Sequence, residues 1–116
     1  LSVPDPDLAV VPGAKQSYRG VRANPTTAVL IVEVSETTLA EDRRSKGSLY
    51  AASGIADYWI LNIVTGCLEV YRDPVPDTTA EFGARYGSSA TIQPGGSIAP
   101  LAAPNSPVAV ADLLPA

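Results

Sequence analysis

The run "VLIVEVSETT" at residues 29–38 most restricts how this chain can fold. Residues 29–34 are apolar except for Glu33, which is typical of a strand buried on both faces of a sheet. A strand of this kind needs a layer of structure on each side, so the run predicts a layered domain. An ionised carboxylate inside such a strand is strongly unfavourable unless a cation, a proton or solvent meets it. Glu33 therefore needs a partner elsewhere in the chain.

A helix is predicted directly after this strand, over residues 38–53. Thr38 and Glu41 have the spacing of a capping box at its start, and Gly54 follows its end in the position of a left-handed capping glycine. At about 100° per residue, its apolar side comprises Leu39, Lys46, Leu49 and Tyr50, and its polar side comprises Glu41, Arg44, Ser45 and Ser48. Lys46 is therefore a second charge that points inward.

The remaining segments complete an α/β domain with a mixed central sheet. We expect a short strand at "DLAVV" (7–11), with Asp7 at its first position, and a surface loop over 13–28. "DYWILNI" (57–63) and "CLEVYRD" (67–73) flank a turn and predict a β-hairpin. The rest of the chain predicts one strand in "ARYGSSATIQ" and an irregular cover over the sheet edge that ends in "VAVADLLP".

The length and composition indicate a single domain spanning residues 1–116. No apolar run approaches the roughly 20 residues of a membrane span, and no signal peptide is recognisable, so we expect a soluble cytoplasmic protein. The chain opens on "LSVPDPDL" without Met, so we expect that its N-terminal portion is missing. The net charge of −4 argues mildly against tight, non-specific nucleic-acid binding, although residues 1–46 hold as many basic as acidic groups.

The residue types that are absent restrict the chemistry. The chain has no His and one Cys, which excludes Ser-His triads, Cys-His dyads, internal disulfides and His-ligated metal sites. Three ionisable residues stand at energetically unfavourable places: Asp7, Glu33 and Lys46. If the strands are neighbours, the two carboxylates can converge and bind Mg²⁺ or Mn²⁺. The lysine can then position water or stabilise a phosphoryl oxygen.

An ion pair offers a second interpretation of the same residues. Glu33 and Lys46 could neutralise each other in the core while Asp7 caps a turn. Asp42 lies four residues before Lys46 on the predicted helix and could also hold the amine. Spacing alone leaves both interpretations open.

Several segments of the chain resemble one protein family over nearly its whole length. They are "PDLAVV", "LIVEVSETTLAEDRRSKGSLYAASGIADYWILNI", "LEVYRDP" and "VADLLP". The most specific part is the combination E-V-S, D-x-x-x-K and G-I-x-x-Y-W-I, because its spacing links a strand, a helix and the following strand. This pattern resembles the Uma2 family, restriction-endonuclease-like proteins within the PD-(D/E)XK nuclease superfamily.

The resemblance implies a restriction-endonuclease-like fold, in which helices flank a mixed central sheet, and a divalent-metal site for phosphodiester hydrolysis. Matched residue by residue, Asp7 is the PD aspartate, Glu33 is the (D/E) acid and Lys46 is the lysine. The main-chain carbonyl of Val34 would be a further metal ligand. Asp5 is the alternative for the PD role.

This chain departs from the superfamily pattern at Ser35, because the usual lysine lies at that position, two residues after the acid. Lys46 must then supply the amine from the helix. The resemblance predicts a Mg²⁺- or Mn²⁺-dependent endonuclease acting on DNA, and we expect a homodimer. The alternative is a catalytically inactive nuclease-like module that acts through binding or assembly, which the displaced lysine and the acidic balance favour.

Overall fold

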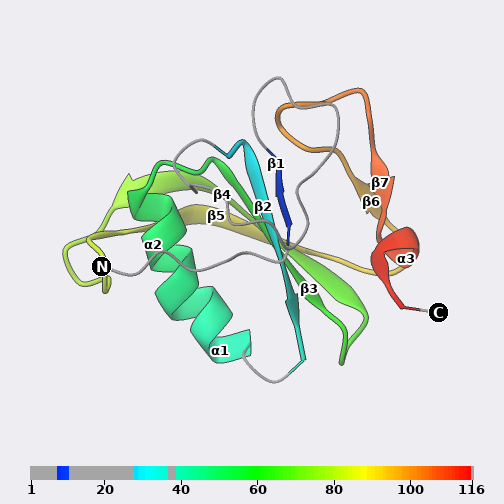
Figure 1. The fold of residues 1–116 in the computed structure, drawn as a ribbon, viewed down its shortest axis with the longest axis horizontal. Coiled ribbons are helices and arrows are strands. Elements are labelled where there is room, and N and C mark those ends of the chain that lie inside the picture. The colour runs from blue at the N-terminus through cyan, green and yellow to red at the C-terminus, as the bar shows by residue number, and fades with distance from the viewer. Residues whose placement is uncertain (1–7, 11–27, 37–38, 116) are drawn as a thin grey trace.

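A five-stranded mixed sheet in the order β1-β2-β3-β4-β5 forms the centre of the computed structural model, which describes residues 8–10, 28–36 and 39–115 (Figure 1). The strands are β1 (Leu8–Val10), β2 (Leu30–Ser35), β3 (Asp57–Asn62), β4 (Cys67–Pro76) and β5 (Ala84–Ile92). β2 and β3 run parallel, and the other neighbouring strands are antiparallel. The predicted mixed α/β architecture is confirmed, with β2 as an inner strand and β3 in the middle.

One continuous helix connects β2 to β3 and packs on one face of the sheet (Figure 1). It consists of α1 (Leu39–Glu41), the π-helical segment η2 (Asp42–Lys46) and α2 (Gly47–Ala52). The predicted left-handed glycine is confirmed at Gly54, with a φ of 79°. The predicted capping residue Thr38 lies outside the described residues. No helix in the described ranges is long and apolar enough to cross a membrane.

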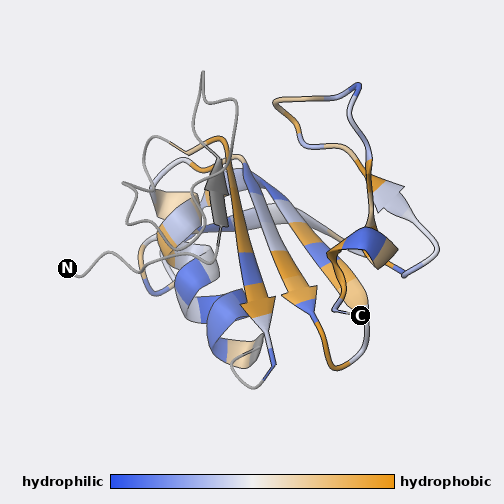
Figure 2. Cartoon of the chain, turned by 45° about the vertical axis from the view of Figure 1, so that its right-hand side comes forward, coloured by the Kyte–Doolittle hydropathy of each residue, from blue (hydrophilic) through white to orange (hydrophobic). Residues whose placement is uncertain are grey.

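Alternation along the strands divides the apolar side chains into two clusters, one on each face of the sheet. Figure 2 shows the hydrophobic stretches of the strands from which these clusters come. The helix-side cluster consists of Ala28, Ile31, Tyr50, Ile55, Tyr58 and Ile60, with Tyr71 and Tyr86 packed against it. The ring of Tyr58 meets Tyr50 edge-on at 5.0 Å and stacks on Tyr86 at 5.9 Å. Tyrosine rings therefore fill the space between the helix and the sheet.

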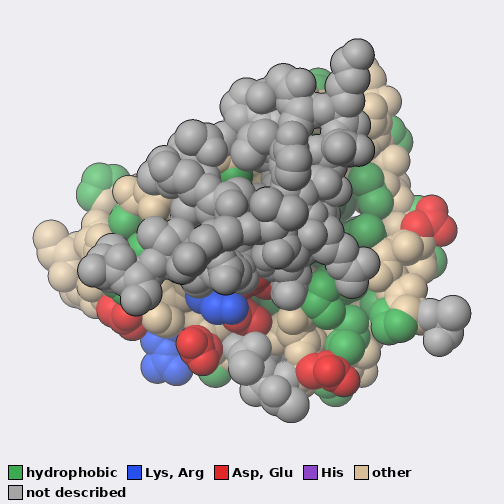
Figure 3. Space-filling view, viewed as in Figure 1, with side chains coloured by type: hydrophobic (Ala, Val, Ile, Leu, Met, Phe, Trp, Pro, Cys, Tyr) green, Lys and Arg blue, Asp and Glu red, His purple; other side chains and the backbone are tan. Residues whose placement is uncertain are grey.

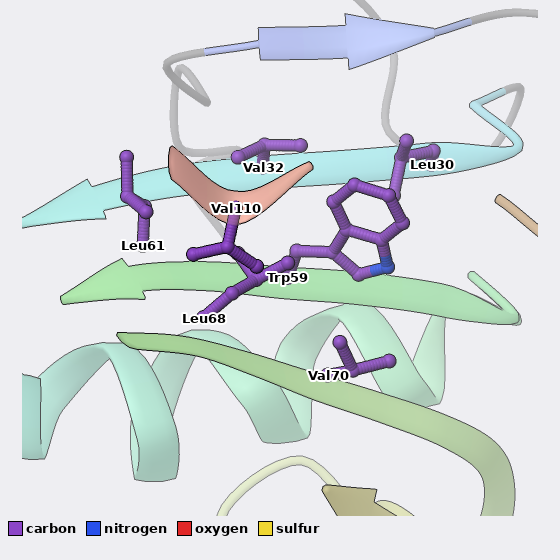
Figure 4. Close-up of a cluster of buried hydrophobic side chains, with 7 residues drawn as sticks. All are labelled: Leu30, Val32, Trp59, Leu61, Leu68, Val70 and Val110. Atoms are coloured by element: carbon purple, nitrogen blue, oxygen red, sulfur yellow. The ribbon is translucent and has the colours of Figure 1, made fainter. Parts of the chain in front are cut away.

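The opposite-face cluster surrounds Trp59 (Figure 4). It consists of Leu30, Val32, Trp59, Leu61, Leu68, Val70 and Val110. Its outer layer comes from the C-terminal segment, which forms β6 (Ser97–Ile98), β7 (Val108–Ala109) and the short α3 (Val110–Leu113). The prediction that this segment covers the edge of the sheet is wrong. It covers a face, because β2, β3 and β4 carry apolar side chains on that face and need a cover there.

A buried carboxylate ties this cover to the sheet. Asp57 is 0% exposed and accepts hydrogen bonds from the Trp59 indole at 2.7 Å and the Arg72 guanidinium at 2.9 Å. It also accepts the backbone N–H of Leu101, in the C-terminal segment, at 2.9 Å. Arg72 Nη2 donates to the Ala99 carbonyl at 2.7 Å, so both partners of this ion pair hold the same segment. Asp57 therefore has a structural role.

The helix departs from its predicted polar face at Ser48, which is buried. The Ser48 hydroxyl donates to the Ala84 carbonyl at 2.7 Å and accepts the Phe82 backbone N–H at 2.9 Å, which joins α2 to β5. The cause lies in η2, where the Gly47 N–H bonds the carbonyl of Asp42, five residues earlier. This wider turn shifts the following side chains away from a uniform 100° pattern.

Candidate functional site

Glu33 projects from β2 toward the helix, on the same face of the sheet as Ile31. Its side chain is 1% exposed, and its Oε2 lies 2.7 Å from Lys46 Nζ. The fold joins these residues because the crossover helix begins directly after β2 and packs back over that face. The structure thus brings together two of the site residues predicted from the sequence.

Asp42 holds the same amine. Its side chain is buried, and its Oδ1 lies 3.2 Å from Lys46 Nζ, one helical turn away. Burial alone would lower the pKa of Lys46, but the hydrogen bond and the charge of Glu33, followed by those of Asp42, raise it above its ordinary value. Lys46 is therefore a protonated ammonium at neutral pH. The predicted i, i+4 pair between Asp42 and Lys46 is confirmed.

The π-helical segment η2 contains both helix residues of this cluster. Such turns are rare and occur frequently at functional sites. The Asp42 carbonyl accepts two hydrogen bonds, one from the Gly47 N–H and one from the Tyr58 hydroxyl at 2.9 Å. Burial, followed by the negative charges of the two nearby carboxylates, raises the pKa of Tyr58, so this hydroxyl keeps its proton and acts as a donor. Tyr58 thereby fixes the turn that presents Lys46.

Ser35 lies two residues beyond Glu33 on the same face of β2 and is 1% exposed. Within the part of the chain that the structure describes, its hydroxyl oxygen has no hydrogen-bond partner. A buried hydroxyl without a partner is unfavourable and marks a place where a water or an ion can bind. The strand face that carries the candidate carboxylate therefore offers an additional oxygen ligand.

A second charged cluster, which the sequence predictions missed, lies two strands away from Glu33. Glu69 on β4 is aligned with Ile60, which is in turn aligned with Glu33. Both Glu69 carboxylate oxygens accept hydrogen bonds from Arg43, and Oε1 also accepts the Tyr71 hydroxyl at 2.6 Å. The hydrogen bond from Arg43 lowers the pKa of Glu69, outweighing burial, which would raise it.

A sequence signal for this second cluster existed. Glu69 interrupts the strand "CLEVYRD" at a position that faces the helix, just as Glu33 interrupts its own strand. An inward carboxylate at Glu69 needs a cationic partner for the same reason as the one at Glu33.

Asp7 and its alternative Asp5 lie outside the described residues. The residues that follow Asp7 are described and belong to β1. Leu8, the residue after it, opens β1 and pairs with Val32, the residue before Glu33, in an antiparallel register. The strand that follows Asp7 therefore lies directly beside the strand that carries Glu33.

The donor set suits a hard divalent cation in kind. Glu33 and Asp42 are buried carboxylates whose oxygens meet at the ammonium of Lys46, and Ser35 adds a hydroxyl on the same face of β2 as Glu33. Mg²⁺ and Mn²⁺ prefer such oxygen ligands and retain several waters. Among the described residues, no three Asp, Glu, Cys or His side chains form a metal-binding group.

Comparison with curated proteins gives no significant match. A family model does match: residues 1–100 correspond to Uma2, described as "Putative restriction endonuclease". This match covers β1, β2, the whole π-helical segment and the β3–β4 hairpin. The chain therefore belongs to the Uma2 family.

Proposed function

We propose that this protein is a Mg²⁺- or Mn²⁺-dependent endonuclease of the PD-(D/E)XK type that hydrolyses phosphodiester bonds in DNA. Membership of the Uma2 family supports nuclease activity. The order of β1, β2, the crossover helix and β3 supports a restriction-endonuclease-like core. The observation that carries the proposal is the contact of 2.7 Å between the buried carboxylate of Glu33 and Lys46 Nζ, on a π-helical turn.

Asp7 and Glu33 are the proposed metal ligands, with the main-chain carbonyl of Val34 as a third. The pairing of Leu8 with Val32 supports this, because it places the strand that follows Asp7 beside the strand that carries Glu33. Asp42 shares the amine of Lys46 and serves as its positioning residue.

A bound Mg²⁺ or Mn²⁺ would supply a water of lowered pKa and neutralise charge on the phosphoryl group. Lys46 contributes as a cation. Its raised pKa keeps it protonated, so it can donate a hydrogen bond to the attacking water or to a developing phosphoryl oxygen, and it is not a general base. Glu33 and Asp42 hold the amine at this place before substrate binds.

Titration calorimetry with Mn²⁺ tests the metal site directly. Wild type should bind Mn²⁺, and Glu33→Gln and Asp7→Asn should each abolish binding and Mn²⁺-dependent cleavage of plasmid DNA. Glu36→Gln is the matched control, because Glu36 is an exposed carboxylate that follows the same strand. Near-ultraviolet circular dichroism of each variant shows whether the fold is kept. If folded wild type binds no Mn²⁺, the metal-dependent mechanism is wrong.

A second candidate function is an inactive nuclease-like module that acts by binding or assembly. The contacts of Lys46 with both Glu33 and Asp42 favour it, because they also satisfy a purely structural ion-pair network.

We expect a homodimer under either function. Light scattering after size-exclusion chromatography tests this, and a monomer at micromolar concentration would contradict it.

A further inference from the structure

Three arginines line a single pocket of about 440 Å³ between the helix and β5. They are Arg43 and Arg44 from η2 and Arg85 from β5. The rings of Tyr71 and Tyr86 belong to the same lining, and we call this site the arginine pocket. We propose that the arginine pocket binds a phosphate group of a nucleic-acid strand. This inference rests on the proposed nuclease function, for which nothing above assigns a substrate-binding residue outside the metal site.

The distribution of basic residues supports a site for an anion. The described part of the chain contains the basic residues Arg43, Arg44, Lys46, Arg72 and Arg85. Arg72 is paired with Asp57 on the opposite face of the sheet. All the others lie at the arginine pocket or at the adjoining candidate site, in a chain whose net charge is −4. Figure 3 shows basic and acidic side chains side by side over the helix.

Arg43 is oriented before any ligand binds. Its Nε and Nη2 donate to the two carboxylate oxygens of Glu69, and the Tyr71 hydroxyl holds Glu69 in turn. A guanidinium has five N–H donors, so this bidentate contact leaves others available at the pocket. Because the orientation is already fixed, a phosphate group that binds Arg43 loses little side-chain entropy.

Arg44 and Arg85 supply less constrained charge. Arg44 is exposed and forms no ion pair within residues 8–10, 28–36 and 39–115. Arg85 contacts Asp77 at 3.1 Å, but its side chain is 56% exposed, so solvent screening weakens that pair. Glu81, the one acidic residue in the described lining, accepts a hydrogen bond from Ser45. Both arginines can therefore bind a phosphate group without breaking a strong ion pair.

The tyrosines explain why the ligand is a nucleic-acid strand and not phosphate alone. The Tyr71 and Tyr86 rings lie 6.2 Å apart, and their hydroxyls are already bonded to Glu69 and to the Ile55 carbonyl. Both rings also pack against Tyr58, so they offer to the pocket the ring surface that this packing leaves open, and aromatic rings bind the bases of single strands by stacking. A volume of about 440 Å³ also exceeds what one phosphate group fills.

The position of the arginine pocket suits a nucleic-acid strand that is also bound at the candidate site. Arg43 and Lys46 lie on the same π-helical segment, three residues apart. A nucleic-acid strand whose reacting phosphate lies at Lys46 would place a neighbouring phosphate at Arg43 and Arg44. The two sites would then bind one continuous backbone.

Fluorescence anisotropy with a labelled single-stranded oligonucleotide in EDTA tests this without cleavage. Arg44→Gln with Arg85→Gln should weaken binding about fivefold. The slope of log affinity against log salt should fall by about 0.7 for each phosphate that the variant no longer binds. Asn105→Asp with Ser106→Asp is the matched control, because it makes the net charge more negative by two units, as the double variant does, at exposed positions in the C-terminal segment. It should leave the slope unchanged.

Nuclear magnetic resonance with inorganic phosphate provides the second arm. Phosphate should shift amide signals of η2 and of residues 79–86, and the double variant should not respond. Oligonucleotide binding that is equal in wild type and double variant would overturn the pocket proposal while leaving nuclease function intact. Shifts with phosphate in a protein that binds no oligonucleotide would overturn the nucleic-acid assignment. Mn²⁺ binding measures the candidate site independently of both results.

Discussion

The ammonium of Lys46 lies 2.7 Å from the carboxylate of Glu33 and joins the π-helical turn to an inner strand of the sheet. The two residues are 13 positions apart in the sequence, Glu33 on β2 and Lys46 on η2, and the fold brings them into contact. It resolves the electrostatic problem of a carboxylate inside an apolar strand. In the proposed mechanism the same contact also positions the amine for hydrolysis, so that one pair would have both a structural and a catalytic role.

Glu33→Gln should lower the free energy of unfolding by about 1–3 kcal/mol, because one partner of a largely buried ion pair loses its charge. Lys46 retains its contact with Asp42 and is 29% exposed, which limits the loss. Urea denaturation at pH 7 measures this change. Glu36→Gln, at an exposed position, should change the stability by less than about 0.5 kcal/mol. Equal effects of the two variants would contradict the ion pair.

Protonation of Glu69 should lower the stability of the protein in acid. Its pKa is lowered below the ordinary value of 4.5 in the folded state, mainly by the hydrogen bond from Arg43. Its contribution is therefore complete above pH 4.5 and is lost as the pH falls through the folded-state pKa. Urea denaturation at several pH values between 6 and 3 should give a steeper loss of stability in wild type than in Glu69→Gln. Parallel curves would count against this assignment.

Ser48→Ala should lower the free energy of unfolding by about 1–3 kcal/mol, because it removes a buried hydroxyl that bridges α2 and β5. The carbonyl of Ala84 and the N–H of Phe82 would both be deprived of the hydroxyl that they bond. Thermal unfolding followed by circular dichroism measures the loss. Ser45→Ala is the matched control, since its hydrogen bond to Glu81 is exposed and its removal should have little effect.

Val110→Ala should destabilise the protein by about 2 kcal/mol, because Val110 is 0% exposed and packs in the cluster around Trp59. The fluorescence of Trp59, the only tryptophan, should change in the folded state. Val64→Ala removes the same atoms at a position that is 73% exposed and should be nearly neutral. A neutral Val110→Ala variant would mean that the C-terminal segment does not stabilise this face.

Local patterns in the sequence predicted most of the fold. The apolar run around Glu33, the turn before Cys67 and the glycine at position 54 each act through neighbours in the chain, so β2, the hairpin and the helix end follow from them. The burial of Ser48 did not follow, because it depends on a π-helical turn and on partners that lie 34 and 36 residues away. Helical periodicity contains no information on either.

The candidate site was predictable in part for the same reason. Glu33 and Lys46 were identified because each charge interrupts an apolar pattern of its own element. The contact of Arg43 with Glu69 spans 26 residues and two elements, so only the fold reveals the partner. The face covered by the C-terminal segment likewise depends on sheet order, which the strand sequences do not specify.

The π-helical turn also makes chain length a determinant of which helix side chains contact the sheet. Deleting one residue between Asp42 and Lys46 would restore the ordinary four-residue hydrogen-bond spacing and rotate the preceding residues by about 100°. The helix would still form and α2 would still pack on the sheet, and Asp42 would remain a neighbour of the amine at a spacing of three residues. Arg43, however, would rotate about the helix axis and away from Glu69 on β4 if the deleted residue followed it. A relative that is one residue shorter here would therefore share the fold and the ion pairs of its lysine but would lose the contact between the helix and the β4 carboxylate.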